Sequence, residues 1–598
     1  MSDELKHECA VAMVVLRKPA IASGDFGGTK LSLLLEKQHN RGQDGAGAAI
    51  LSSNPEPGET PYWIAKSAST TPLADVLGML TKRSRVATEV TGFERVFLGH
   101  LRYATFGKND VAFCHPFVHE ASELNHTLLL AGNFNLTNAH ELFDDYRHHG
   151  SFPTSKSDGY LITSLIAKQL EGRSAKPENR ISRAISDALA NADGAWTLCG
   201  MTADGWAFAT RDPHGIRPGW HYIDDDVVVV ASERAAIQAA FDVPPEAVKE
   251  LPPGKALVVS PEGDVDLSEL SSTINTAPRH CSFERIYFSR ANDADIHRER
   301  KALGAALVPQ ILEAANAPMD RIFFSYIPNS ARIAFHGLLG KLFSDVFSTG
   351  LTGSSRGVHP ALSAPAATSL RSGDAPDPMN LLNPVKSIPR FGEVAVKDAK
   401  FRTFIADAAA RREFYKHVYD VTYGLVKKDD TLVVLDDSIV RGNTMKNAIL
   451  PMLDRLGPKR IVIASSAPPI RYPDCYGIDM STLGELVAFR ALVNLLGDGA
   501  NDLLHEALMG NAKNPLEALY AKFTEEQHAA EIARLLTPPD IRAEVVVVYQ
   551  TVEDLRRCLG GENIGDWYFT GDYPTPGGCK VLRKALLNYL DKKSERSY

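Results

Sequence analysis

Residues 431–446 read Thr-Leu-Val-Val-Leu-Asp-Asp-Ser-Ile-Val-Arg-Gly-Asn-Thr-Met-Lys, and they say most about the fold of the second half of the chain. Leu432–Leu435 predict a short buried strand that runs directly into two carboxylates, Asp436 and Asp437. Buried carboxylates need hydroxyls or a cation as partners. The following loop offers hydroxyls, backbone N–H groups and a guanidinium before a predicted helix, an arrangement that binds anions. The stretch therefore predicts a sugar-phosphate site, with carboxylates for ribose hydroxyls and magnesium and a loop for the phosphate.

The sequence around this stretch alternates between apolar runs and longer helical patterns. From about Ile322 onward these segments are Ile322–Ile327, Arg332–Phe343, Thr431–Leu435, Thr444–Leu456 and Arg460–Ser465. Such alternation is typical of βαβ units around a parallel sheet. Residues 500–540 predict polar helices, and residues 350–390, rich in Ser, Ala, Pro and Gly, predict a flexible insertion.

The N-terminal half has a different pattern. Short β-type runs are broken by Gly, Asn and Asp turns, as at Arg95–Leu98, His126–Leu130, Ala207–Thr210 and Val227–Val230. Between them lie the predicted helices Gly159–Leu170 and Ile181–Ala190. This mixture indicates an α+β arrangement of sheets and helices.

Length and composition limit the class of protein. A chain of 598 residues is too long for one core, so we expect two large domains. A hydrophobic fraction of 44% and a charged fraction of 23% are ordinary for a soluble protein, and a net charge of −8 argues against broad nucleic-acid binding. No apolar stretch has the length of a membrane span, Met1–Glu8 is unlike a signal peptide, and seven scattered cysteines do not suggest disulfides. We expect a cytoplasmic enzyme without nucleic-acid or membrane partners.

Cys9, at the head of an apolar run, gains significance from the segments that follow it. Alone it is equally well explained as a small core residue. Downstream lie segments 40–47 (Asn-Arg-Gly-Gln-Asp-Gly-Ala-Gly), 99–105 (Gly-His-Leu-Arg-Tyr-Ala-Thr), 132–138 (Gly-Asn-Phe-Asn-Leu-Thr-Asn), 157–159 (Ser-Asp-Gly) and 211–218 (Arg-Asp-Pro-His-Gly-Ile-Arg-Pro). The last of these predicts a rigid, salt-bridged turn. Cys114 and Cys199 are expected to be core or surface thiols.

In this order the segments resemble the class II glutamine amidotransferases, and the 431–446 stretch resembles the phosphoribosyl-pyrophosphate (PRPP) motif of type I phosphoribosyltransferases. Together they resemble most the amidophosphoribosyltransferases, a likeness that extends to Cys281-Ser282-Phe283-Glu284 and to residues 468–479. The resemblance implies a propeptide at 1–8, a glutaminase domain at 9–275 and a phosphoribosyltransferase domain at 276–598. The implied fold is an α+β N-terminal-nucleophile domain of four αββα layers, followed by an α/β domain with a parallel sheet.

The resemblance assigns Cys9 as the nucleophile, and amide hydrolysis explains the other roles. After removal of Met1–Glu8, the α-amine of Cys9, with an ordinary pKa near ~8, would act as the base. Arg102 would bind the substrate carboxylate and Asp158 its ammonium group. Asn133 would donate its side-chain amide and Phe134 its backbone N–H to the oxyanion. The family has Gly where Phe134 stands, so a positive φ at this position would be strained.

In the second half the resemblance implies a PRPP site that also holds Mg²⁺. The expected metal ligands are Ser330, Asp436 and Asp437. The expected PRPP-binding residues are Arg402, Asp436, Asp437, Ser438, Ile439, Val440, Arg441, Gly442, Asn443 and Thr444. Arg402-Thr403-Phe404-Ile405 matches the start of a mobile loop, but the basic run that follows is thinned to Arg411, Arg412 and Lys416. Fewer cations predict weaker clamping of pyrophosphate.

Some family members carry an iron–sulfur cluster on four cysteines, and we expect none here. Cys281 matches one cysteine position, but Cys475 is displaced by one place, with Asp474 in the expected position. Residues 565–571, in the corresponding C-terminal run, contain no cysteine. Four thiolates hold such a cluster, so the set is incomplete.

The hypothesis that follows from the resemblance is a glutamine-dependent amidophosphoribosyltransferase, which would catalyse the first step of de novo purine synthesis with PRPP and glutamine as substrates. A homo-oligomer and a purine nucleotide as feedback ligand are also expected. Three alternatives stay open from the residues: a paralogue that aminates another phosphoribosyl compound, a glutaminase whose second domain only senses nucleotide or PRPP, and an N-terminal-nucleophile amide hydrolase acting on other substrates.

Overall fold

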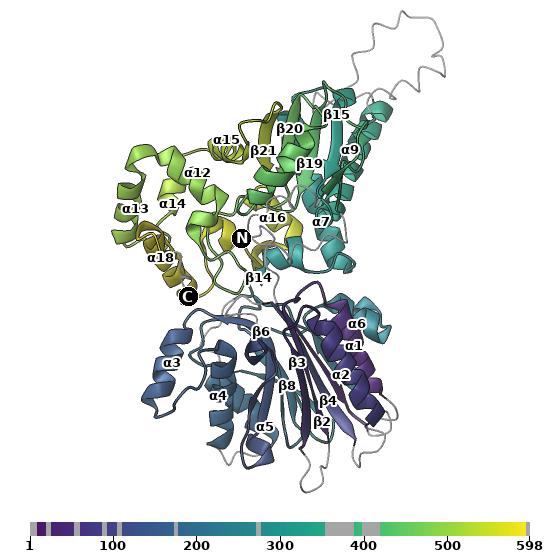
Figure 1. Ribbon diagram of the computed structural model, residues 1–598, viewed down its shortest axis with the longest axis vertical. Coiled ribbons are helices and arrows are strands. Elements are labelled where there is room, and N and C mark those ends of the chain that lie inside the picture. The colour runs from purple at the N-terminus through teal and green to yellow at the C-terminus, as the bar shows by residue number, and fades with distance from the viewer. Residues whose placement is uncertain are drawn as a thin grey trace, which may run out of the picture.

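The computed structural model describes residues 9–18, 25–52, 60–86, 93–103, 110–172, 177–270, 277–352, 388–397 and 419–593. The predicted propeptide, residues 353–387 of the predicted insertion and the loop from Arg402 lie outside this part of the chain. Figure 1 shows two halves, with the N-terminal half in purple and blue below and the C-terminal half in teal to yellow above.

The N-terminal half contains two antiparallel sheets. The seven-stranded sheet has the order β11-β9-β10-β1-β4-β2-β3. Its strands are β1 (Ala10–Leu16), β2 (Gly45–Ser52), β3 (Tyr62–Ser67), β4 (Glu94–Arg102), β9 (Trp220–Ile223), β10 (Val227–Ala231) and β11 (Lys249–Glu250). The six-stranded sheet has the order β13-β12-β8-β7-β6-β5. Its strands are β5 (Phe117–His119), β6 (Leu128–Leu136), β7 (Gly194–Thr202), β8 (Ala207–Arg211), β12 (Lys255–Val259) and β13 (Val265–Glu269).

The apolar residues of these strands explain how the sheets pack. Val11, Met13 and Val15 of β1 belong to a buried cluster with residues of the six-stranded sheet, so the two sheets face each other. The alternate residues of β1 pack against α1 (Phe26–Lys37), α2 (Pro72–Val86) and α6 (Arg234–Phe241). Residues of the six-stranded sheet's other face pack against α3 (Ala139–His148), α4 (Asp158–Glu171) and α5 (Pro177–Ala188). Short 3₁₀ turns are η3 (Val111–Phe113), η4 (Leu124–His126) and η5 (Pro245–Ala247).

The C-terminal half is built on a parallel sheet, as the alternating pattern predicts. Five strands have the order β16-β15-β19-β20-β21 and pair in parallel. They are β15 (Ile322–Tyr326), β16 (Arg390–Phe391), β19 (Thr431–Asp436), β20 (Arg460–Ser465) and β21 (Glu544–Tyr549). One face packs on α8 (Val308–Ala315) and α9 (Arg332–Thr352), and α7 (Ala294–Ala306) packs against α9. The other face packs on η11 (Met445–Ile449), α11 (Leu450–Asp454), α12 (Val487–Leu496) and α15 (Glu525–Leu536).

A helical region beside this sheet completes the half and contacts the N-terminal half. Its buried cluster includes Ala195 and Ile216 of the N-terminal half. Two short strand pairs lie outside the parallel sheet: β14 (His280–Cys281) pairs with β22 (Ile564–Gly565), and β17 (Ala395–Lys397) pairs with β18 (Tyr419–Val421). The remaining helices are α13 (Ala500–Met509), α14 (Glu517–Tyr520), α16 (Val552–Leu559), α17 (Trp567–Thr570) and α18 (Pro576–Leu590). The remaining short helical turns are η6 (Glu284–Phe288), η7 (Met319–Arg321), η12 (Leu483–Glu485), η13 (Gly497–Gly499) and η14 (Gly561–Asn563).

One predicted range needs correction. The helix that begins at Arg332 continues to Thr352, inside the range 350–390 assigned to an insertion. The helix predicted over Thr444–Leu456 is confirmed: helical residues run from Asn443 to Asp454, with a π-helical turn over Met445–Ile449 before α11. Pro451, near the start of α11, has no backbone N–H to donate, which explains the irregular hydrogen bonding there.

None of the helices in the described ranges is long and apolar enough to span a bilayer.

Candidate active sites

Cys9 lies at the point where β1 begins, beside the end of β4. Ala10 pairs with Leu101, so Cys9 reaches the last residues of the neighbouring strand. The Tyr103 backbone N–H donates to Cys9 Sγ at 3.4 Å. Burial raises the pKa of the Cys9 thiol to about 11, an effect that the Tyr103 N–H and Arg102 oppose and Asp158 increases. A thiol with so high a pKa is almost entirely protonated at neutral pH, so its attack on an amide requires a base.

Arg102 and Asp158 lie close to Cys9 and carry opposite charges. Arg102 ends β4 and is buried, and its guanidinium lies over the Phe113 ring at 5.6 Å. Asp158 begins α4 and is half-buried. Burial raises the pKa of Asp158 to about 6, while the Gly159 N–H and Arg102 act in the opposite direction. The structure therefore brings a cation, a carboxylate and a thiol together, as the sequence predicted.

Asn133 and Phe134 lie near the end of β6, and the ladder orients their backbone. Phe134 pairs with Trp196 of β7. The carbonyl of Trp196 points away from β6, because it accepts the Asp212 N–H at 2.9 Å. In an antiparallel ladder Phe134 then points its own N–H away from β7. Phe134 is not among the described non-glycine residues with positive φ, which are Asp242, Asn316 and Lys592. The strain predicted for a side chain at this position therefore does not arise.

Two histidines that the sequence analysis did not single out hold the residue before Asn133. The rings of His100 and His115 stack with their centroids 3.9 Å apart. His100 Nε2 donates to Gly132 O at 3.1 Å, and the Gly132 N–H donates to His115 Nδ1 at 3.2 Å. Burial lowers the pKa of His100 to about 3 and that of His115 well below its usual value, so both rings are neutral. This pair bonds β6 to β4. The sequence did not reveal it, because the two rings come together only in the folded chain.

In the other half, Asp436 and Asp437 stand at the carboxyl end of the central strand β19. Ser330 donates to Asp437 Oδ2, and Ser438 donates to Asp437 Oδ1 at 3.0 Å. Burial and the charge of Asp437 raise the pKa of Asp436 well above its usual value, and burial raises that of Asp437. Within the described ranges no three His, Cys, Asp or Glu side chains form a metal-binding group. Two carboxylates and a hydroxyl suit a magnesium ion that takes its remaining ligands from water and substrate.

The loop after the acid pair is anchored by its apolar side chains. Ile439 and Val440 are buried in separate hydrophobic clusters. Gly442 has φ +76°, and a Cβ there would lie 2.2 Å from Leu536 Cδ2, so only glycine fits. The Arg441 side chain bonds to Glu485 at 2.8 Å and to Asp479 O at 2.9 Å. The Arg441 guanidinium, predicted to bind PRPP, is thus bonded to both residues in the structure.

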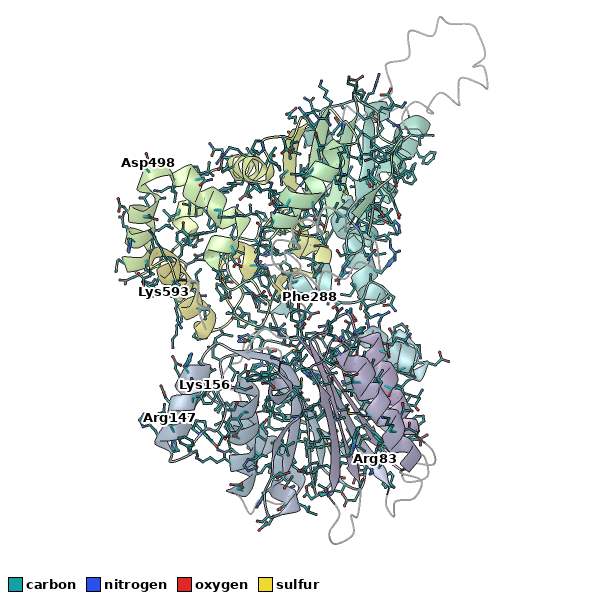
Figure 2. All side chains as sticks on the ribbon, in the orientation of Figure 1. Arg83, Arg147, Lys156, Phe288, Asp498 and Lys593 are labelled. Atoms are coloured by element: carbon teal, nitrogen blue, oxygen red, sulfur yellow. The ribbon has the colours of Figure 1, made fainter. Side chains whose placement is uncertain are left out.

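A buried ion cluster joins the two halves and was not anticipated. Arg41 bonds to Glu233 at 2.7 Å in its own half and to Glu284 at 2.5 Å in the other. Asn40 donates to Glu233 and to the backbone of Phe288, which is labelled at the junction of the halves in Figure 2. Because Arg41 lies three residues before Asp44, whose charge raises the pKa of Cys9, the junction begins close to the candidate nucleophile.

The segment 211–218 and the remaining cysteines occupy structural positions. Arg211 bonds to Glu250 and to backbone oxygens of Gly215 and Leu251, while Asp212 accepts backbone N–H groups of the turn. The segment is thus a salt-bridged turn, as predicted, and the carboxylate that pairs with Arg211 is Glu250. Cys114, Cys199, Cys281 and Cys475 are buried. Cys281 Sγ contacts the Tyr568 hydroxyl at 3.2 Å, and Asp474 accepts the Tyr476 and Ile478 N–H groups.

Comparisons with known proteins confirm the predicted resemblance. No family model matches the chain. The amidophosphoribosyltransferase of Methanocaldococcus jannaschii is 28% identical over 471 residues, which cover 76% of this chain and 83% of the relative. The amidophosphoribosyltransferase of Escherichia coli is 28% identical, covering 69% of this chain and 74% of the relative, and that of Bacillus subtilis is 29% identical, covering 65% and 69%.

Solved structures show the same fold. The glutamine PRPP amidotransferase of B. subtilis in complex with ADP and GMP matches with a TM-score of 0.63 and 24% identity, covering 95% of this chain and 97% of that one. A structure described as the allosteric regulatory enzyme of purine biosynthesis matches with a TM-score of 0.64 and 24% identity, covering 95% and 96%. The fold that the sequence predicted for the two halves together is thus the fold of these enzymes.

Proposed function

We propose that this relative of the amidophosphoribosyltransferases converts glutamine, PRPP and water to 5-phosphoribosylamine, glutamate and pyrophosphate, the first step of purine synthesis. One observation carries the proposal. A single chain holds a thiol beside an opposite-charge pair in one half, and an acid pair followed by an anion-binding loop in the other. The first set suits a zwitterionic amino acid, and the second suits a phosphorylated sugar.

We also propose the finer fold and the domain limits. The hydrophobic clusters on both sides of each N-terminal sheet support a four-layer αββα, N-terminal-nucleophile arrangement over residues 9–275. Residues 276–598 would form the phosphoribosyltransferase domain, including the helical region beside the parallel sheet. The proposed removal of residues 1–8 would leave Cys9 with a free α-amine.

In the proposed glutaminase reaction, the α-amine of Cys9 takes the thiol proton and Sγ attacks the amide carbon. Arg102 binds the α-carboxylate of glutamine and Asp158 binds its ammonium group. The Asn133 side-chain amide and the Phe134 N–H stabilise the oxyanion. Collapse of the tetrahedral intermediate breaks the C–N bond and releases ammonia with the transferred proton. Water then cleaves the thioester to give glutamate and regenerate the thiol.

In the proposed transfer, ammonia attacks C1 of the ribose and the bond to pyrophosphate breaks. Asp436 and Asp437 bind ribose hydroxyls and, with Ser330, would hold Mg²⁺, which offsets the charge of the leaving pyrophosphate. The backbone N–H groups of residues 438–444 bind the 5-phosphate. Arg402 is proposed to close over PRPP. Cys281 and Cys475 offer two thiols where a cluster needs four, so no iron–sulfur chemistry is proposed.

We further propose a purine nucleotide as feedback ligand and a homo-oligomer as the assembly. The B. subtilis structure with ADP and GMP supports the first of these.

Phosphoribosylamine formation with either glutamine or ammonium as nitrogen donor tests the proposed function. The intact enzyme should use both donors and should require PRPP and Mg²⁺ with each. Glutamate release that is never accompanied by phosphoribosylamine would reject the transferase function and leave a glutaminase. Mass spectrometry of the active enzyme should find Cys9 as the first residue, and full activity with residues 1–8 retained would reject the α-amine as base.

A further inference from the structure

Residues 474–480, which we name the bridge loop, contact both candidate sites. At one end the loop accepts a hydrogen bond from the strand that carries Asn133 and Phe134. At the other end it accepts a hydrogen bond from the loop that follows Asp436 and Asp437. These contacts connect two segments that are more than 300 residues apart in the sequence.

The first contact is made by Asn135, the residue directly after Phe134 in β6. Asn135 Nδ2 donates to Cys475 O at 2.6 Å. The loop lies so close that a Cβ on Gly477 would be 2.3 Å from Arg217 Nη2 and 3.4 Å from Asn135 Cβ. Gly477 also has φ +117°, a conformation that other residues rarely adopt. The strand of the proposed oxyanion hole is thus tied directly to the bridge loop.

The second contact is made by Arg441, within the proposed PRPP loop. Arg441 Nη2 donates to Asp479 O at 2.9 Å, and Arg441 Nε donates to Glu485 Oε2 at 2.8 Å. The Val487 N–H donates to Val440 O at 2.9 Å. The proposed PRPP loop is therefore bonded directly to the end of the bridge loop and to the residues that follow it.

The bridge loop itself is stiff. Asp474 Oδ2 accepts the N–H groups of Tyr476 at 2.9 Å and Ile478 at 2.7 Å, and the Asp474 N–H donates to Met480 O at 3.0 Å. The side chains of Cys475, Tyr476, Ile478 and Met480 are buried. A close-packed, internally bonded loop transmits a displacement because it has no slack in which to absorb it.

We propose that Asn135 is a positioning residue, whose bond to the bridge loop aligns Asn133 and Phe134 for oxyanion stabilisation when PRPP occupies the second site. This inference rests on the proposed function. Oxyanion donors act over a narrow range of distance, so a small shift of β6 changes hydrolysis without changing glutamine binding. Asn135 thereby prevents the release of ammonia before its acceptor is in place.

The test compares Asn135→Asp with Asn138→Asp. Both changes remove an amide donor to a backbone carbonyl in the same half, since Asn138 Nδ2 donates to Asn191 O at 2.8 Å. Glutamate release is measured at saturating glutamine, with and without PRPP and Mg²⁺.

PRPP should raise glutamate release by about 5-fold or more in the wild type and in Asn138→Asp. In Asn135→Asp the stimulation should fall to within about 2-fold of unity, through kcat rather than the KM for glutamine. Ammonium-dependent phosphoribosylamine synthesis should be unchanged.

Glu485→Ala tests the contact at the other end of the bridge loop, because Glu485 holds the Arg441 guanidinium that donates to Asp479 O. Removing the Arg441 partner should lower the PRPP stimulation when Asn135 is intact, and should add nothing in Asn135→Asp, because one path is already broken. Equal stimulation in Asn135→Asp and wild type, or equal losses in Asn135→Asp and Asn138→Asp, would overturn the inference. So would a wild type that forms phosphoribosylamine without any PRPP effect on glutamate release, although the proposed function would then stand. Failure to form phosphoribosylamine from either donor would reject both.

Discussion

The two candidate sites place charge in opposite ways. In the N-terminal half, Arg102 and Asp158 bring one positive and one negative charge to Cys9. In the C-terminal half, Asp436 and Asp437 adjoin each other, and the nearest guanidinium of their own loop, that of Arg441, is held by Glu485 and Asp479. The first site therefore has an opposite-charge pair, to which Asp44 adds a second negative charge, whereas the second site places two carboxyl groups side by side with the Arg300 guanidinium acting on Asp437.

This difference indicates what each site must receive. A balanced pair of charges complements a zwitterion, whose ammonium and carboxylate replace the water that solvates the pair. An unbalanced acid pair is stabilised when a divalent cation arrives, either before the substrate or with its phosphates. Glutamine hydrolysis should therefore depend on two ionised side chains, whereas ribosyl transfer should depend on added cation. Substitutions at the two sites should separate these two dependences.

The largest effect is expected from Cys9→Ala. Loss of the nucleophile should lower glutamine-dependent synthesis by about 10⁴-fold or more, and ammonium-dependent synthesis should be retained. Assays of phosphoribosylamine with each donor measure both. Cys558→Ala, a change at another half-buried thiol, is the control and should behave as wild type. Glutamine use by Cys9→Ala would remove the nucleophile assignment.

Asp437→Asn should have the reverse selectivity. One carboxylate fewer weakens the contacts to ribose and cation, so synthesis with either donor should fall by about 10²–10³-fold. Glutamate release without PRPP should be unaffected, because Cys9, Arg102 and Asp158 are untouched. Asp429→Asn, on an exposed residue before β19, is the matched control. The separation of the sites would be disproved if Asp437→Asn reduced basal glutamate release to the same degree.

A smaller effect is expected from Arg102→Lys, which keeps the charge but loses the planar fork that binds a carboxylate. The kcat/KM for glutamine should fall by about 10–100-fold, mainly through KM, with no change in ammonium-dependent synthesis. Arg83→Lys, a change in the Arg83–Glu94 ion pair of the same half, should leave both unchanged. A loss confined to kcat would instead assign Arg102 to the transition state.

The sequence predicted the end of β19 accurately, because the apolar run Leu432–Leu435 changes abruptly to the acid pair at Asp436. The run Arg95–Leu98 located β4, but this strand begins at Glu94 and continues to Arg102. The α9 boundary and the π turn at Met445–Ile449 were missed, because they depend on packing and on the local effect of Pro451 rather than on hydrophobic periodicity.

Partnerships between distant residues could not be predicted. Nothing in the sequence indicates that His115 stacks on His100, or that Arg441 bonds to Asp479 and Glu485. The interface cluster of Arg41, Glu233 and Glu284 joins three segments whose separation in the sequence reaches 243 residues. Motifs identify which residue types gather at a site, but the direction of a long side chain is decided by the partners that the tertiary fold supplies.

The smallest effect concerns pH and follows from Asp158. Its pKa of about 6 means that a growing fraction is protonated below pH 6, and a neutral carboxyl binds the glutamine ammonium poorly. The kcat/KM for glutamine should therefore fall about 5-fold between pH 6 and pH 5. Acid unfolding through this residue does not explain such a fall. A carboxyl whose pKa is higher in the folded than in the unfolded chain favours folding as the pH drops from about 6 toward its unfolded value.

In Asp158→Asn, kcat/KM should be low and should lose this pH dependence, while melting curves at pH 5 and pH 6 control for stability. If the acid limb persisted in Asp158→Asn, another group would be responsible, and the balanced charge pair would no longer describe the glutamine site.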